Sequence, residues 1–326
     1  MEMTYQQSIS DYEYSGKKRK TRKEIFLERM EKLIPWEAII KLIEPHYPKV
    51  GSKGGRPPIG IEKMLRMLLI AAWFNLSDEG TEDAVTENQT IRLFVGVNLS
   101  KENAPDATTL LQFRHLLERN GIYEQIFEKI NELLLANGMT ITTGTIVDAS
   151  IIEAPKSTKN ANKERDPEMH STKKGNQWYF GMKAHIGVDE DSGIIHSVTG
   201  TAANVHDITE AHNLLRATDS IARGDAGFVG LDKRDEIKEK FPELICIINQ
   251  RPGKFRTLAQ DTPERLYEQS KASIRAKVER PFLFVKKIFG YGKVRYRGIA
   301  KNLNRLFLLF ACTNLIFAAE NGDFCC

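Results

Sequence analysis

The sequence predicts a chain in two parts, an all-helical N-terminal part and a mixed α/β part built on a sheet. Before residue 139, apolar residues recur at intervals of three and four, the spacing of amphipathic helices. From Met139 onward, short runs rich in β-branched and aromatic residues alternate with helical patterns. A length of 326 residues is sufficient to bury two cores. We therefore expect a flexible polar arm over residues 1–15, a helical domain over 16–138 and an α/β domain over 139–326.

The N-terminal part contains five predicted helical segments, several of them marked by a start or stop signal. Pro35 divides the first apolar pattern, because an interior proline lacks the N–H that a helix needs. Asp106 is a candidate N-cap, and Asn137 with Gly138 forms a candidate C-cap. The segments cover residues 21–43 with the break at Pro35, 61–74, a stretch beginning near Ser77 or Thr81, 106–118 and 123–135. Between the first two, residues 48–58 are rich in glycine and proline and are predicted to form a basic loop.

The α/β part is expected to contain three strands followed by alternating helices and strands. A turn at residues 189–193 separates the second strand from the third. Asp207 and Glu210 have the spacing of a capping box at a helix start. The predicted strands cover 142–152, 178–188, 193–201, 223–226 and 244–249, and the predicted helices cover 207–216, 232–241 and a final stretch after a polar loop that ends near 269. This order is compatible with a ribonuclease-H-like mixed sheet.

Positive charge is concentrated in three segments of the chain. The formal net charge is only +4, so the clustering and not the total indicates a nucleic-acid partner. The first run is a candidate phosphate contact, which would make affinity depend on salt. The three clusters are Lys17, Lys18, Arg19, Lys20, Arg22 and Lys23; Lys49, Lys53 and Arg56; and eleven basic residues between Lys271 and Arg305.

The helix predicted over residues 106–118 has two interpretations. Gln112 and Arg114 lie off its apolar face, as in the second helix of a helix-turn-helix that reads DNA. An ordinary helical bundle explains the same pattern, and both interpretations stay open.

Glu279 is the single acid within the basic segment 271–305. A carboxylate there would repel phosphate unless it held a divalent metal against it. Mg²⁺ and Mn²⁺ prefer such hard oxygen ligands. The position of Glu279 therefore favours metal-dependent chemistry on nucleic acid.

Two further acids stand at positions where an α/β sheet builds sites. Asp148 lies inside the first predicted strand between apolar neighbours, and Asp225 lies where a later strand opens into a glycine-rich turn. An acid among apolar residues is costly to bury unless it is paired or binds metal. One acid at a strand end is more often a turn or cap residue. Three, on two strands and a helix, predict a shared metal site.

Arg275 and Lys286 share a predicted helix with Glu279. Spacings of four and seven residues place the three side chains on nearly one face, with two phosphate contacts flanking a metal ligand. The structural alternative is a surface pair between Arg275 and Glu279, worth about 0.3–0.5 kcal/mol. Pro281 weakens the phase argument, because a proline can kink the helix before Lys286.

Four other clusters in the α/β part have a functional and a structural interpretation. Asp166, Glu168 and His170 form either a second metal site or a solvated loop, and Lys173 with Lys174 either contact the DNA backbone or are ordinary surface lysines. His185, with Asp189, either approaches Asp148 or is a structural histidine with satisfied hydrogen bonds. Trp178 and Tyr179 either stack on an unpaired base or pack against the sheet.

Compartment signals favour a cytoplasmic protein. The four cysteines show no zinc-ligand spacing, and we expect them to be reduced. The N-terminus is polar where an export signal would be apolar. The apolar tract 306–319 is interrupted by Thr313 and Asn314, and we expect it to be a buried helix too short to span a membrane.

Several motifs resemble the transposases of the bacterial insertion sequence five family, within the insertion sequence four group of DDE transposases. The likeness extends over nearly the whole chain, including residues 18–36 and 56–75. In the family pattern Tyr-x2-Arg-x3-Glu-x6-Lys, the last three positions are Arg275, Glu279 and Lys286, and the tyrosine position is Ala272. The motifs are TIVDASIIEAP (145–155), RDPEMH (165–170), KKGNQWYFGMKAHIGVD (173–189), GDAG (224–227) and ASIRAKVERPF (272–282).

The resemblance implies that Asp148, Asp225 and Glu279 are the catalytic triad and bind two Mg²⁺ ions, with Mn²⁺ as a substitute. It implies a transposase that binds the terminal inverted repeats of an element, hydrolyses its ends and joins the 3′-hydroxyls to target DNA. The expected partners are double-stranded DNA and a second copy of the chain in the synaptic complex, associated with a bacterial nucleoid and with no membrane. The expected DNA contacts are Arg275, Lys286, Lys17, Lys18, Arg19, Lys20, Arg56, Arg114, Lys173 and Lys174.

Two other functions compete with this one. A junction-resolving nuclease with the same kind of core would share the metal chemistry and lack strand transfer. A non-catalytic DNA-binding regulator would bind DNA without nicking it, and the retained acids argue against it.

Overall fold

The computed structural model describes residues 16–49, 57–161 and 163–322. The chain divides into two compact units between Gln125 and Ile126, called unit 1 and unit 2 below. The predicted arm, most of the predicted basic loop and Arg56 lie outside the described residues.

Within the described residues, unit 1 contains only helices and turns, and all of its α-helices except α6 lie where the sequence predicts a helix. Thr21 and Glu24 form a capping box at the first helix, and Pro35 separates the first helix from the second. The Asp106 carboxylate accepts a bond of 2.6 Å from the Thr109 N–H. The helices are α2 (Arg22–Leu33), α3 (Trp36–Ile43), α4 (Ile61–Trp73), α5 (Asp78–Glu87), α6 (Gln89–Val95), α7 (Ala107–Arg119) and the start of α8 (Ile122–Ala136).

The interior of unit 1 contains a buried arginine whose charge is fully partnered. Arg66 on α4 is 4% exposed and bonds the carboxylates of Glu31 and Glu62. Its guanidinium lies 4.1 Å from the ring centroid of Trp36 and 5.1 Å from that of Phe94. These contacts join α2, α3, α4 and α6 around one charge.

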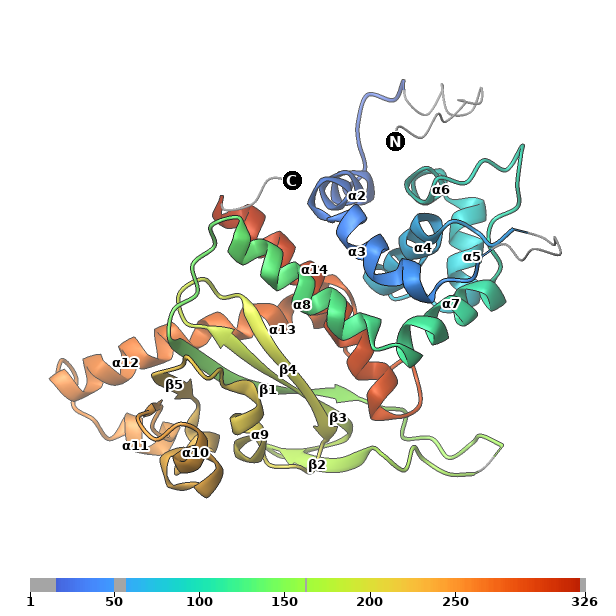
Figure 1. Ribbon diagram of the computed structural model, residues 1–326. Coiled ribbons are helices and arrows are strands. Elements are labelled where there is room, and N and C mark those ends of the chain that lie inside the picture. The colour runs from blue at the N-terminus through green and yellow to red at the C-terminus, as the bar shows by residue number, and fades with distance from the viewer. Residues whose placement is uncertain (1–15, 50–56, 162, 323–326) are drawn as a thin grey trace. The chain divides into compact units, whose positions relative to one another are not determined.

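Unit 2 is built on a mixed six-stranded sheet with the order β2-β3-β1-β5-β6 (Figure 1). β1 pairs antiparallel with β3 and parallel with β5, and β5 pairs parallel with β6. The far edge of β3 is shared, with β2 along its first residues and β4 along the rest. The strands are β1 (Gly144–Glu153), β2 (His170–Lys174), β3 (Gln177–Asp189), β4 (Ile195–Ala202), β5 (Ile221–Gly224) and β6 (Ile245–Ile248).

Helices cover both faces of this sheet. A Cβ at Gly187 of β3 would meet the Leu214 backbone of α9 (Asp207–Leu214), whereas a Cβ at Gly200 of β4 would meet Ile299 and Leu303 of α14 (Ile299–Asn321). Gly187 pairs with Val147 of β1, and Gly200 pairs with Ala184 of β3. Because side chains alternate along a strand, Val147 faces α9 and its neighbour Asp148 faces the side of α14.

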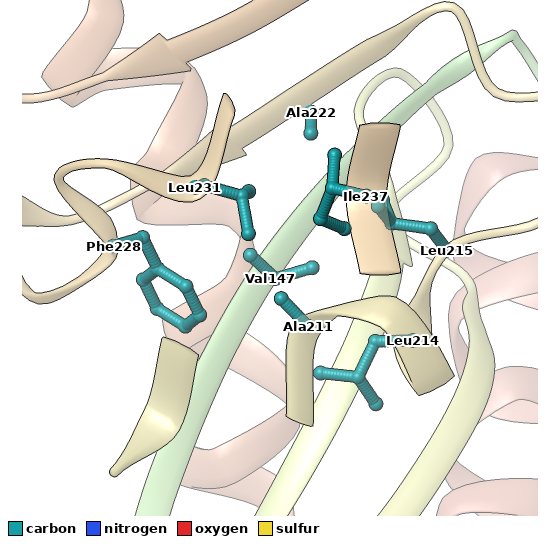
Figure 2. Close-up of a cluster of buried hydrophobic side chains, with 8 residues drawn as sticks. All are labelled: Val147, Ala211, Leu214, Leu215, Ala222, Phe228, Leu231 and Ile237. Atoms are coloured by element: carbon teal, nitrogen blue, oxygen red, sulfur yellow. The ribbon is translucent and has the colours of Figure 1, made fainter. Parts of the chain in front are cut away.

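A compact apolar core lies between the sheet and α9 (Figure 2). Val147 of β1 and Ala222 of β5 contribute from the sheet, and Ala211 and Leu214 contribute from α9. Phe228, which follows β5, is 1% exposed and completes the cluster from the loop side. The loop after β5 is therefore fixed to the core by its aromatic residue.

α14 is the central helix of unit 2, and it packs beside α8 (Figure 1). The amide of Asn314 bonds the Asn131 amide of α8 at 2.7 Å and the Ile195 carbonyl of β4 at 2.7 Å. The helix has 23 residues and is apolar enough to cross a membrane by length and composition, but 83% of that window is buried within the structure. The predicted burial is confirmed, and the predicted shortness is wrong because the helix begins before the apolar tract.

Three elements of unit 2 differ from the sequence-based expectation. Residues 170–174 form β2, although their alternating polar and charged residues lack a buried face. The loop predicted to extend to residue 269 contains α11 (Pro252–Arg256) and most of α12 (Pro263–Arg275). Thr262 caps α12, and Pro263 stands at its first position, where a missing N–H costs nothing.

Candidate active site

The strand register places Asp148 and Asp225 at the same level of adjacent strands. The last residue pair of the β1–β5 ladder joins Ile146 to Arg223, and each acid lies two residues further on. Asp225 still has extended backbone, with φ −76° and ψ −178°. Neighbouring strands lie about 4.8 Å apart, and residues at one level share a face of the sheet. The fold thus brings together two acids that are far apart in the sequence.

Asp148 has an environment that disfavours its charge. Its side chain is 20% exposed and accepts a hydrogen bond of 2.8 Å from the Ala149 N–H. Burial raises the pKa of Asp148 to about 6, helped by the negative charges of Asp225 and Asp207 and partly offset by the Ala149 N–H and Arg275. A cation placed against this carboxylate would relieve that penalty.

Asp225 is held by the turn that it starts. Its carboxylate accepts a bond of 2.8 Å from the Gly227 N–H and caps the short 3-10 turn Ala226–Phe228. Gly224 precedes it because a Cβ there would lie 2.9 Å from the buried Phe228 ring. The glycine-aspartate-alanine-glycine motif therefore places an exposed carboxylate beside Asp148 and locks its backbone to the core.

Glu279 begins α13 (Glu279–Leu283), which follows α12 through the 3-10 turn η4 (Ala276–Val278). Its side chain is 61% exposed and accepts a bond of 2.7 Å from Arg275. Pro281 lies in the first turn of α13, so its missing N–H does not interrupt a helix interior. The predicted pairing of residues 275 and 279 across one turn is present.

Arg275 connects Glu279 to the strand that carries Asp148. One guanidinium nitrogen lies 2.7 Å from Glu279 and the other lies 3.8 Å from the Asp148 carboxylate. No group of three or more His, Cys, Asp or Glu side chains in the described residues is arranged to hold a metal ion. The guanidinium occupies the position of a counter-ion between two carboxylates. This stand-in charge and the hard oxygen donors fit a divalent cation, provided that Arg275 moves aside.

Lys286 lies in a π-helical turn, η5 (Phe284–Ile288), a type of turn that is frequent at functional sites. Its ammonium donates a bond of 2.6 Å to the Ile151 carbonyl of β1. Burial lowers the pKa of Lys286 to about 8, and the nearby Lys174 adds to the effect. The ammonium borders a hollow of about 340 Å³ that is also lined by Lys174, Lys287, Glu153 and Tyr179.

Of the other predicted DNA contacts within the described residues, five are exposed to solvent, whereas Lys17 and Arg114 are held in ion pairs. Lys18, Arg19, Lys20, Lys173 and Lys174 are exposed, and Lys20 pairs with Glu28. Lys17 pairs with Glu24, and Arg114 is 6% exposed and bonds Asp78 at 2.7 Å. The guanidinium of Arg114 thus ties α7 to α5 inside unit 1, which favours the helical bundle over a groove-reading role for this side chain.

Two of the four clusters with two interpretations have structural partners, whereas Lys173, Lys174 and Trp178 are exposed. Asp166 accepts a bond from the Gly298 N–H at 2.6 Å and Glu168 accepts one from the Ile299 N–H at 2.8 Å, so both acids cap α14. His185 is fully buried, pairs with Ala149 rather than Asp148, and bonds Thr201 at 2.7 Å. It faces α9, away from the acids.

Sequence reasoning missed part of the site. Lys287 shares the hollow with Lys174, although the two come from a helix and a strand far apart in the chain. Gly292 of the following segment bonds Glu153 of β1, which brings the exposed Lys293 beside them. The basic composition of 271–305 signalled these residues, but only the fold shows that they meet β1 and β2.

Comparison with known protein families gives two matches. Residues 140–315 match the family described as Transposase DDE domain, and residues 15–116 match the family described as Transposase domain (DUF772). The first match contains all three acids, and the second covers most of the helices of unit 1.

Proposed function

The chain belongs to the family of transposases with a DDE domain, and from that premise we propose that it cuts DNA at the ends of an insertion sequence and joins them to a target. The observation that carries this proposal is that Asp148 lies beside Asp225 of the adjacent strand end and within 3.8 Å of Arg275, whose guanidinium also bonds Glu279. We assign these three acids as the catalytic residues.

The strand order supports a ribonuclease-H-like core. Without β2, the sheet reads β4-β3-β1-β5-β6, with three antiparallel strands followed by two parallel ones. The acids lie on the central strand, at the end of its parallel neighbour, and on a helix on the same face. This is the arrangement that a metal-dependent phosphoryl-transfer site requires.

The three acids would hold two Mg²⁺ ions, with Mn²⁺ as a substitute. When bound there, the ions supply Lewis acidity to the phosphodiester and lower the pKa of a water. Asp148 must be ionised for this, and with a pKa of about 6 its carboxyl is already largely ionised at pH 7. With the acids neutralised by the metal ions, Arg275 and the Lys286 ammonium beside β1 would neutralise phosphate oxygens.

Each step of the reaction forms one P–O bond and breaks another, so no nucleotide cofactor is needed. Water attacks the scissile phosphorus, and the P–O bond to the 3′ oxygen breaks, which leaves a 3′-hydroxyl and a 5′-phosphate. The 3′-hydroxyl then attacks a phosphorus of the target, forms one P–O bond and releases a target 3′-hydroxyl. One site serves both steps because their chemistry is the same.

The DNA backbone is proposed to follow a surface that we call the basic ridge. Lys156 bonds the Trp178 carbonyl, and Trp178 pairs with Lys173 across β2 and β3. Arg295 and Arg297 line a second hollow, of about 190 Å³, next to the first along the 292–297 segment. The ridge consists of seven exposed residues of unit 2: Lys156, Lys173, Lys174, Lys287, Lys293, Arg295 and Arg297.

The remaining assignments follow from the resemblance to the insertion sequence five family. We propose that residues 16–138 bind the terminal inverted repeats, with Lys17, Lys18, Arg19 and Lys20 at the phosphates. The active assembly is proposed to be a homodimer that bridges two element ends on the nucleoid, in the cytoplasm.

A joining assay tests the proposal. The purified chain is incubated in Mg²⁺ with a labelled duplex carrying the inverted repeat that flanks its gene, and with a plasmid target. We expect wild type and the control Asp232→Asn, an exposed acid after β5, to nick the end and join it. Asp148→Asn, Asp225→Asn and Glu279→Gln should bind the duplex and do neither.

The other outcomes separate the competing functions. Nicking without joining would identify a resolving type of nuclease, and binding without nicking would identify a regulator. An Asp225→Asn protein that nicks at the wild-type rate would refute the assignment of the acids.

A further inference from the structure

The turn between β3 and β4 is bonded to the segments that carry or immediately precede the three catalytic acids. The Glu190 N–H donates to the Gly144 carbonyl of β1 at 3.0 Å, and the Glu190 carboxylate pairs with Arg223 of β5. Lys277 of η4 donates to the Glu190 carbonyl at 2.7 Å and to the Asp191 carbonyl at 3.2 Å. Glu190 is thus a common anchor for the approaches to Asp148, Asp225 and Glu279.

The turn is rigid enough to serve as an anchor. The Asp189 side chain is fully buried and accepts hydrogen bonds from the Thr142 N–H at 2.7 Å and the Ser192 N–H at 2.8 Å. The Glu190 side chain lies so close over Gly144 that a Cβ there would stand 2.1 Å from its carboxyl carbon. These contacts leave the Glu190 carboxylate little freedom to leave Arg223.

Unless Glu190 holds it, the Arg223 guanidinium can reach the catalytic carboxylates. It lies two residues before Asp225 along extended backbone, so the two side chains share one face of the sheet. The Arg223 and Glu190 side chains are 14% and 16% exposed, which leaves few other partners for the guanidinium. Arg275 already shows that a guanidinium settles against these carboxylates. Arg223 released from Glu190 would find Asp225 as the next acceptor along its own strand.

We propose that Glu190 is a positioning residue that holds the Arg223 guanidinium away from Asp225 and so keeps the acids open to a divalent cation. This inference rests on the proposed function, because it assumes that the acids bind metal. Its distinctive consequence is that loss of Glu190 weakens metal binding only through the released Arg223. Removing both residues should therefore restore metal binding.

Metal binding by the full-length chain tests this directly. Free Mn²⁺ is measured by its electron paramagnetic resonance signal during titration of wild type, Glu190→Gln, Arg223→Gln and the double variant. We expect Glu190→Gln to weaken Mn²⁺ binding about tenfold, the low end of what removing an outer-shell partner costs. Arg223→Gln and the double variant should bind as wild type does. Glu236→Gln, which breaks the exposed pair with Arg234, is the matched control and should change nothing.

The possible results decide the matter. Unchanged Mn²⁺ binding by Glu190→Gln, or a double variant as weak as that single variant, would overturn the inference. If Glu190→Gln does not fold, Arg223→Gln is compared with the double variant, and a tenfold difference between them would also overturn it. A wild-type chain that binds no Mn²⁺ would refute both this inference and the proposed metal chemistry, whereas normal wild-type joining with an unaffected Glu190→Gln refutes the inference alone.

Discussion

At the scale of single residues, the site is a balance between acids that repel one another and cations that compensate them. The pKa of Asp148 is raised to about 6 by burial and by its acidic neighbours, while Arg275 supplies the nearest positive charge. The folded chain therefore carries a charge at Asp148 that destabilises it, and a bound cation would relieve this cost. Such a conflict is typical of functional sites.

Replacing Asp148 by asparagine should stabilise the metal-free protein at pH 7. A raised pKa means that the folded state holds the proton more tightly than the unfolded chain, so wild-type stability falls as pH rises from about 4 to about 6. Asp148→Asn removes this loss, and its free energy of unfolding at pH 7 should exceed that of wild type by roughly 3 kcal/mol, because the pKa is raised from 3.8 to about 6 and each unit is worth about 1.4 kcal/mol.

Urea denaturation with EDTA at pH 4 and pH 7 measures this difference. Wild type and Asp148→Asn should converge at pH 4, where Asp148 is protonated in the folded state. Asp261→Asn, at an exposed turn position, serves as the control and should match wild type at both pH values. An Asp148→Asn protein less stable than wild type at pH 7 would contradict the account.

Lys286 should make DNA binding sensitive to pH. Burial lowers the pKa of its ammonium to about 8, so the positive charge disappears as the pH rises above that value. The affinity of wild type for a duplex end, measured by fluorescence anisotropy, should fall between pH 7 and pH 9. Lys286→Met should bind more weakly at pH 7 and lose this pH dependence. Equal slopes in wild type and Lys286→Met would argue against Lys286 as a phosphate contact.

At the scale of elements, local sequence patterns predicted most of the helices and strands. Capping residues such as Thr21 and Asp106 act within one turn of their own helix, so a short window of sequence contains the signal. β2 was missed because it is exposed on both sides and is held by pairing with β3, which no local pattern reveals. α12 was partly missed because its residues are mostly polar, although Thr262 caps the helix and Pro263 begins it.

The placement of site residues was predictable only where an element itself sets the spacing. The bond between Arg275 and Glu279 follows from one helical turn, and it is present. The roles of Asp166 and Glu168 depend on the distant start of α14, and that of Arg114 depends on Asp78 in another helix. Long-range partners such as these are set by the tertiary fold.

Gly224→Ala should damage the element that presents Asp225. A Cβ at this position would lie 2.9–3.1 Å from Phe228, whose ring belongs to the buried cluster of Figure 2. Overpacking of this kind costs about 1–3 kcal/mol, and displacement of the turn should reduce nicking even where the protein remains folded. Thermal unfolding and the nicking assay measure the two effects.

Gly253→Ala is the matched control for that substitution. Gly253 lies in α11, and a Cβ there would meet nothing within 4 Å. This variant should be as stable as wild type or slightly more stable, because alanine restricts the unfolded chain. Equal stability of the Gly224→Ala and Gly253→Ala proteins would remove the argument from Phe228.

At the scale of the whole molecule, the formal net charge is small although one surface is strongly basic. The formal net charge is +4, yet the seven exposed residues of the basic ridge gather around the end of β1 and β2. Of the acids near this surface, Asp166 and Glu168 accept hydrogen bonds from the start of α14, whereas Glu153 lines the hollow beside Lys174 and Lys287. A polyanion that follows the ridge therefore meets more attraction than repulsion.

The salt dependence of DNA binding tests the ridge. For the double variant Lys293→Gln with Arg297→Gln, the slope of log affinity against log salt should decrease in magnitude by about 1.8, because each lost phosphate contact contributes about 0.9. Nitrocellulose filter binding between low and moderate salt measures the slope. Lys233→Gln with Lys238→Gln, outside the ridge, should leave it unchanged, and an equal effect of both pairs would show that the ridge is not a specific path.

α14 follows all three acids in the chain, and the sheet of unit 2 packs against it. α14 ends at Asn321, and its Asn314 holds β4 through both the N–H and the carbonyl of Ile195. A ribosome that has already released all three acids still retains the helix that covers their side of the sheet. The nascent chain is therefore expected to be inert until α14 has emerged from the ribosome, and a premature stop ahead of α14 should yield a product unable to cleave the host chromosome.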